Sequence, residues 1–129
     1  MSTPYDTDDE LLAGRGKSWE IRSLNDEFRT APNLIASAIA LHHLVITRGV
    51  ADRGNDFIDR AVKAVRDFSD FGESNDPYGE HDFGSFDLDG VTLFWKIDYY
   101  DLLLEYGSPD PADPLVTRRV LTILLADEY

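Results

Sequence analysis

The sequence predicts an α+β fold, an antiparallel sheet of about four strands with three helices packed mainly on one face. Apolar residues recur at helical spacing through residues 55–71, and an Asp-Gly pair at residues 89–90 separates two runs that alternate between apolar and polar residues. The first pattern is typical of an amphipathic helix and the second of a β-hairpin. We expect the order α-β-α-β-β-β-α within one domain, residues 17–129, because a chain of this length is the size of a single domain.

The first part of the chain is expected to hold a tail, a helix and a strand. Residues 1–16 are polar and acidic and are interpreted as a mobile tail. A helix is expected at about Ser18–Thr30, which begins with a capping serine and carries apolar residues at positions i, i+3 and i+7. The alanine-rich stretch Leu34–Leu41 is left open, and the β-branched run His43–Arg48 is interpreted as a buried strand.

The middle of the chain predicts a helix over Asn55–Phe71 and then the hairpin. A two-residue turn pairs Leu88 with Val91 and sets Gly84 across from Trp95, where the glycine leaves room for the indole ring. The face of the hairpin that joins the core is expected to carry Phe86, Leu88, Val91, Leu93, Trp95 and Ile97.

Two further elements are expected near the C-terminus. The apolar run Leu102–Tyr106 predicts a fourth strand. Asp113 followed by Pro114 is typical of a helix start, because Asp caps the first turn and proline fits the first helical position. The buried side of this final helix is expected to hold Val116, Val120, Leu121, Leu124 and Leu125.

Acidic residues are concentrated in one segment of the chain. The net charge is −13, and residues 67–113 hold 13 acidic residues and one basic residue, Lys96. This charge disfavours nucleic acid and membranes as direct partners and favours a basic protein surface. The chain has no cysteine, which excludes disulfides and thiolate chemistry. Neither a membrane span nor a signal peptide is recognisable, so a cytoplasmic location is expected.

The candidate site is an acidic face of the sheet, turned away from the helices. In the predicted register His81 lies across from Asp98, and such a pair could orient the imidazole for general-base chemistry. Together with neighbouring carboxylates, His81 could instead bind a divalent cation. The simplest interpretation is that His81 and Lys96 only neutralise part of the face. The predicted partner-binding residues are Asp76, Tyr78, Glu80, His81, Asp82, Asp87, Asp89, Lys96, Asp98 and Asp101.

Two adjacent histidines and two phenylalanines give weaker signals. His42 and His43 point to opposite faces of a strand, so packing is favoured over a shared site. Phe83 and Phe94 fall on the outer face of the hairpin. There we favour a cover, formed by the final helix or by Leu34–Leu41, over an exposed docking patch.

Four phrases carry a family resemblance: NDPYGEHDFG, FWKIDYYD, GSPDPADP and RVLTILLADEY. From about Leu24 to the C-terminus, the chain resembles a family of small bacterial proteins known as domain-of-unknown-function family 3768. The resemblance implies plasmids and other mobile elements as the genomic setting, often near anti-restriction genes. It implies no established activity, and therefore no catalytic residues.

Three functions follow as hypotheses. The favoured one is an acidic module that binds a basic, nucleic-acid-facing surface of a partner, in its specific form an anti-restriction or anti-CRISPR inhibitor that acts as a nucleic-acid mimic. The first alternative is a small metal-dependent enzyme that uses His81, Asp98 and nearby carboxylates. The second is an oligomeric accessory or structural protein of a mobile element, whose final helix packs against a second copy in a homodimer. Binding is favoured over catalysis, and no cofactor is expected.

Overall fold

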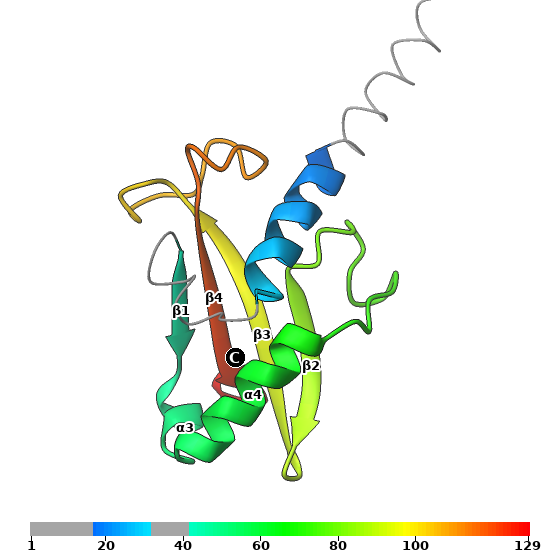
Figure 1. The fold of residues 1–129 in the computed structure, drawn as a ribbon, viewed down its shortest axis with the longest axis vertical. Helices are drawn as coiled ribbons and strands as arrows, with labels where there is room; N and C mark the ends of the chain where they lie inside the picture. Colours follow the sequence, from blue (N-terminus) through cyan, green and yellow to red (C-terminus); the bar gives the residue numbers. More distant parts are fainter. Residues whose placement is uncertain (1–16, 32–41) are drawn as a thin grey trace, which may run out of the picture.

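The computed structural model describes residues 17–31 and 42–129 of the chain. The predictions for residues 1–16 and for Leu34–Leu41 therefore lie outside the described residues. The described chain forms a four-stranded sheet with helices across one face (Figure 1), which confirms the α+β class. Its elements are a helix over residues 17–29, β1 (His43–Ile46), α3 (Arg48–Ala51), α4 (Asn55–Asp67), β2 (Phe83–Leu88), β3 (Val91–Tyr100), β4 (Arg118–Leu125) and the 3-10 turn η1 (Ala126–Glu128).

The sheet is mixed, whereas a purely antiparallel sheet was expected. Its strand order is β1-β4-β3-β2, with β1 parallel to β4 and both other pairs antiparallel. A parallel pair needs a long connection, and here everything from α3 to β3 lies between the two strands. β1 is an edge strand with His43 and Val45 exposed, so the prediction of a buried strand was wrong for that face.

The predicted final helix is wrong, because this segment is the central strand β4. The run Arg118–Leu125 is rich in β-branched residues and pairs with β1 on one side and β3 on the other. The helix-start signal forms a turn instead, in which the Asp113 carboxylate accepts a hydrogen bond from the Leu115 N–H at 2.9 Å. The predicted homodimer contact through this helix loses its basis with it.

The predicted strand Leu102–Tyr106 is also wrong. β3 continues to Tyr100, where it pairs with β4. Residues 101–106 then form a loop, closed by a single bridge between Tyr100 and Gly107. The number of strands was right only because β4 replaces this run in the sheet.

The hairpin prediction is confirmed in its turn and its register. Leu88 pairs with Val91 and Gly84 with Trp95. Asp89 and Gly90 have φ values of 54° and 76°, which are typical of the two-residue turn that matches strand twist. A Cβ at Gly84 would lie 2.7 Å from Trp95 Cε2, so the indole ring requires glycine there.

The core lies between the sheet and the helices. The helix over 17–29 contributes Phe28, α3 contributes Val50, and α4 contributes its apolar stripe. α4 ends earlier than predicted because Phe68 is extended, but Phe68 and Phe71 still pack against the core. The fully or largely buried residues of β3 and β4 in this core are Leu93, Trp95, Ile97, Leu121, Ile123 and Leu125.

The sheet has two ends that differ in what they carry. At one end β2 begins, β3 ends, and β1 and β4 begin, as the strand registers require. This loop end carries residues 68–82 and 101–117 (Figure 1). The opposite turn end carries the hairpin turn, α3 and η1.

Candidate functional site

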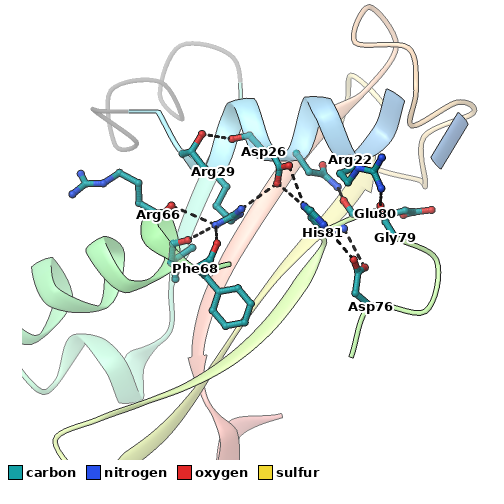
Figure 2. Close-up of polar contacts among 12 residues, drawn as sticks. Arg22, Asp26, Arg29, Arg66, Phe68, Asp76, Gly79, Glu80 and His81 are labelled. Carbon is teal, nitrogen blue, oxygen red and sulfur yellow. Dashed lines mark hydrogen bonds and ion pairs between the residues drawn. The ribbon is translucent and has the colours of Figure 1, made fainter. Parts of the chain in front are cut away.

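A polar stripe on the first helix meets the sheet at the loop end. Arg22, Asn25, Asp26 and Arg29 recur at spacings of three or four residues and therefore share one side of the helix over 17–29. Figure 2 shows this side turned toward Asp76, Gly79, Glu80 and His81 of the loop that precedes β2. The stripe fixes that loop to the helix, starting with a hydrogen bond from Arg22 Nη1 to the Gly79 carbonyl at 3.3 Å.

Arg29 is the buried member of the stripe that joins the first helix to α4. Its Nη1 donates to the carbonyls of Val65 at 2.7 Å and Phe68 at 2.9 Å, both at the C-terminal end of α4. Its Nη2 forms an ion pair with Asp26 at 3.1 Å. The guanidinium also lies 5.1 Å from the Trp95 ring centre. One cation therefore satisfies helix-end carbonyls that would otherwise be buried without donors.

His81 lies between two carboxylates, and neither of them is Asp98. Its Nδ1 is 3.0 Å from both oxygens of Asp26, and its Nε2 is 3.6 Å from Oδ2 of the buried Asp76 carboxylate. The ring stacks on Phe71, with ring centres 3.7 Å apart and planes 5° from parallel. The contact with Asp26 joins His81 and its loop to the first helix, and Phe71 covers one face of the ring.

The predicted pairing of His81 with Asp98 is therefore wrong. β2 begins only at Phe83, and His81 has a φ of 54°. This left-handed conformation interrupts the strand alternation and sends the imidazole to the helix side of the sheet. Asp98 instead accepts a hydrogen bond from Lys96 Nζ at 2.7 Å.

A second buried arginine lies at the centre of a polar chain beneath the first helix. Arg119 Nε donates to Asn25 Oδ1 at 2.7 Å, and Asn25 Nδ2 donates to the Tyr99 hydroxyl at 2.9 Å. Tyr99 in turn donates to Glu80 Oε1 at 2.8 Å. Burial lowers the pKa of Arg119 and raises the pKa of Tyr99. The chain thus links β4, the helix, β3 and the loop before β2.

Carboxylates gather around Asp82 at the loop end. Burial and then the charges of Glu80, Asp76 and Asp98 raise the pKa of Asp82 above its ordinary value. We call these four residues the carboxylate cluster. Lys96 lies at its margin, where the hydrogen bond to Asp98 raises the lysine pKa. The gathered negative charge disfavours ionisation of Asp82 and would favour any cation that approaches.

The carboxylate cluster does not lie on one sheet face, as the sequence predicted. Glu80 binds Tyr99, whose side chain packs against the core, whereas Asp98 is the adjacent residue and points to the opposite face. The cluster therefore wraps around the loop end. Asp101 follows directly in the loop after β3, and Tyr78 in the loop before β2 is 78% exposed.

Asp87 and Asp89 are not part of this cluster. Asp87 accepts a hydrogen bond from Thr92 at 2.7 Å, and Thr92 is six residues from Asp98 along β3, about 20 Å. Asp89 is held by a bidentate contact from Arg60 of α4, with both distances 2.8 Å. The predicted set of partner-binding residues is thus divided between the two ends of the sheet.

The geometry offers little support for metal or acid–base chemistry at His81. Within residues 17–31 and 42–129, no group of three or more His, Asp or Glu side chains is arranged to hold a metal ion. The two carboxylates beside His81 approach opposite ring nitrogens, so they do not converge on one point. A general base also needs a nitrogen that can reach the substrate, and here Asp26 holds Nδ1 while the Asp76 carboxylate lies 3.6 Å from Nε2.

Of the two adjacent histidines, one has a structural role and the other lies exposed. His42 accepts a hydrogen bond from the Arg119 N–H at 3.0 Å through Nδ1 and packs on Phe28, whereas His43 is exposed. Burial, followed by the charge of Arg119, lowers the pKa of His42 from 6.5 to about 4. The two histidines therefore do not form a shared site.

The final helix expected as a cover for Phe83 and Phe94 does not form, and the alternative cover, Leu34–Leu41, lies outside the described residues. The two rings are 5.2 Å apart on the outer face. The Tyr129 ring lies at 5.5 Å from Phe94 in an edge contact. Instead of a final helix, η1 thus brings a single aromatic side chain over them, and both phenylalanines remain half-buried.

Sequence reasoning missed the polar stripe and the two buried arginines. The stripe was visible in principle, because four polar residues recur at helical spacing beside the apolar residues of the same helix. Arg119 gave no such signal. Its burial follows from the assignment of β4 as a strand, which sets every second residue toward the helices.

The fold and the site define a small α+β protein that carries a carboxylate cluster at one end of a mixed sheet. The chain belongs to the family described as "Protein of unknown function (DUF3768)", whose profile matches residues 46–128. This range contains the first three phrases that carry the resemblance and all of the fourth except its last residue, Tyr129. No curated protein and no solved structure matches the chain. Among the described residues, no helix has the length and apolar character required to cross a membrane.

Proposed function

We propose that this protein is an acidic interaction module that binds a basic surface of a partner protein, of the kind that otherwise faces nucleic acid. The carboxylate cluster is the observation that carries the proposal. Burial and then the charges of Glu80, Asp76 and Asp98 raise the pKa of Asp82, and the repulsion among these charges is relieved when a cationic surface docks.

The placement of the cations supports the same proposal. Arg29 and Arg119 are only 3% and 1% exposed, and they donate to interior carbonyls, to Asn25 and to the Asp26 carboxylate. Cations that could have covered the loop end are thus used inside the protein. Residues 67–113 hold 13 acidic residues beside a single basic residue, Lys96.

The specific form of the proposal is an inhibitor of restriction or CRISPR nucleases. Such nucleases bind phosphates through lysine and arginine side chains. A protein surface with closely spaced carboxylates can occupy the same basic groove and exclude the nucleic acid. The mobile-element setting that the family resemblance implies would make this a useful activity.

The proposal is tested by binding to a panel of restriction endonucleases and Cas nucleases at increasing salt. We expect at least one to bind, with an affinity that falls steeply with salt and with competition by DNA. Asp82→Asn should weaken binding and reduce the salt dependence. Asp59→Asn is the matched control, because it removes the same charge from an exposed position on α4. Absence of binding at low salt, or equal effects of the two variants, would contradict the proposal.

A further inference from the structure

The loop after β3 displays large apolar side chains to solvent. We call residues 101–106 the apolar loop. The exposed fractions are 50% for Leu102, 75% for Leu103, 40% for Leu104 and 73% for Tyr106. Single exposed leucines are ordinary on a protein surface, but large apolar residues gathered in one short segment mark an interaction site.

The apolar loop is held in one shape by its own hydrogen bonds. The Asp101 N–H donates to the Tyr106 carbonyl at 2.8 Å, and the Asp101 carboxylate accepts from the Glu105 N–H at 3.0 Å. Arg118 Nε of β4 donates to the Leu102 carbonyl at 3.0 Å. A loop with this many internal contacts loses little conformational entropy on binding, so its side chains are pre-organised for a partner.

Leu104 adds a second observation, because its backbone is strained. Its φ is 59°, in the left-handed region that leucine rarely adopts, and its N–H donates to the Asp101 carbonyl at 3.0 Å. Glycine or asparagine would adopt this conformation more readily. Such strain is found where a binding site fixes the geometry of a loop.

The charge around the apolar loop indicates what it binds. Asp101 and Glu105 lie within the loop itself, and the carboxylate cluster lies at the same end of the sheet. An anionic lipid surface would repel this group of charges. A protein pocket with an apolar floor and a rim of lysine or arginine matches both the leucines and the carboxylates.

We propose that the apolar loop is an anchor that inserts into an apolar pocket beside the basic surface of the partner protein. This inference rests on the proposed function, since it assigns the pocket to the same partner. The carboxylates and the leucines contribute to binding in different ways. The carboxylates give salt-sensitive attraction, whereas a buried leucine gives affinity that salt does not screen.

Leu103→Ser tests the anchor in the nuclease panel, with Leu115→Ser as its control. Leu103 and Leu115 are 75% and 80% exposed, so neither variant should disturb folding. We expect Leu103→Ser to weaken binding by about tenfold at both low and high salt, with the salt dependence unchanged, and Leu115→Ser to have no effect. Salt-dependent binding that Leu103→Ser leaves intact would overturn the anchor and leave the proposed function standing.

A second variant separates binding from folding. Leu104→Gly should raise thermal stability, because glycine relieves the left-handed strain, and should still weaken binding. A variant that failed to fold would lose both thermal stability and binding, so a rise in stability together with weaker binding cannot come from misfolding. Unchanged affinity in Leu104→Gly would count against the anchor.

The anchor also has a test that does not require a nuclease. The probe is a synthetic amphipathic helix of leucine and lysine, which offers an apolar stripe with a basic border. We expect the wild-type protein to bind it and Leu103→Ser to bind it about tenfold more weakly. Equal binding of the peptide by the wild type and by Leu103→Ser would overturn the anchor. So would binding of the wild-type protein to phosphatidylcholine vesicles, or self-association that Leu103→Ser abolishes. If no nuclease binds but the peptide result holds, the nuclease-inhibitor form of the proposed function fails and the anchor on a basic, apolar partner stands.

Discussion

The two ends of the sheet use charged side chains in opposite ways. At the turn end, Arg60 pairs with Asp56 and Asp89 at exposed positions, and the hairpin turn is fixed to α4. At the loop end, Arg29 and Arg119 are buried, and the carboxylate cluster has Lys96 as its basic neighbour. The turn end therefore pairs its charges at the surface, whereas the loop end places two arginines in the interior and gathers several carboxylates around Asp82. This surplus of carboxylates makes the loop end acidic.

The largest expected effect is the loss of the Arg29 guanidinium. Arg29→Met keeps an apolar stem but leaves the carbonyls of Val65 and Phe68 without their donor. We expect the free energy of unfolding to fall by about 3 kcal/mol, since buried acceptors are left unpaired. Urea denaturation measures it. A loss no greater than that of Arg60→Ala would contradict the contrast between the two ends.

Removal of the His81 imidazole should have the next largest effect. His81→Asn keeps a residue that tolerates the left-handed backbone but loses the Asp26 contact and the stack on Phe71. We expect a loss of about 1–2 kcal/mol in thermal unfolding. Addition of zinc or manganese to the wild type should not change its unfolding temperature. A metal-dependent rise that His81→Asn abolishes would instead support a metal site.

Acid should weaken the loop end through His42. Its pKa is lowered from 6.5 to about 4, so the folded protein favours the neutral ring that accepts from the Arg119 N–H. The stabilisation is complete above pH 6.5 and is lost as the pH falls toward 4. Unfolding temperatures measured across this range should decrease less in His42→Gln. An equal decrease in the two proteins would show that other groups dominate.

Neutralising Arg60 should have a smaller effect, confined to the turn end. Arg60→Ala removes exposed ion pairs to Asp56 and Asp89, which water and salt already screen. We expect a modest decrease in unfolding temperature at low salt that disappears at high salt. The same decrease at every salt concentration would indicate a packing effect instead.

The smallest expected effect is an increase in stability rather than a loss, and it concerns Asp82. Because the pKa of Asp82 is raised in the fold, its ionised form opposes folding, and stability falls as the pH rises through the carboxyl range. Asp82→Asn should therefore raise the unfolding temperature slightly at neutral pH. Measurement near pH 3, where the wild-type carboxyl is protonated, should remove the difference. A decrease at neutral pH would show that Asp82 stabilises the loop end.

Local chemistry explains which parts of the fold could be predicted from sequence. Asp89 and Gly90 determine their turn almost alone, and the hairpin register follows from it. The helix prediction for the segment after Asp113 was wrong because the local helix signal competes with pairing to two distant strands. The strand prediction for Leu102–Tyr106 was wrong because an apolar run becomes a strand only if a neighbouring strand is available to pair with it.

The candidate site was harder to predict than the fold. Asp82, Asp98 and Lys96 do lie near one another, although the predicted pairing of His81 with Asp98 was wrong. His81 was misplaced because one residue with positive φ reverses the side of the sheet on which a side chain lies. A sequence pattern of alternating residues carries no warning of such a reversal. The partner-binding role of these residues stays a prediction.

The position of β4 has a consequence for how the chain folds during synthesis. β4 lies between β1 and β3, although it follows both of them along the chain. Until residues 118–125 have left the ribosome, β1 has no strand to pair with and β3 has one open edge. Partly made chains therefore expose unpaired apolar strands, which favours chaperone binding or aggregation at that stage. A slow final step of sheet closure is expected, because the β1–β4 contacts span most of the chain.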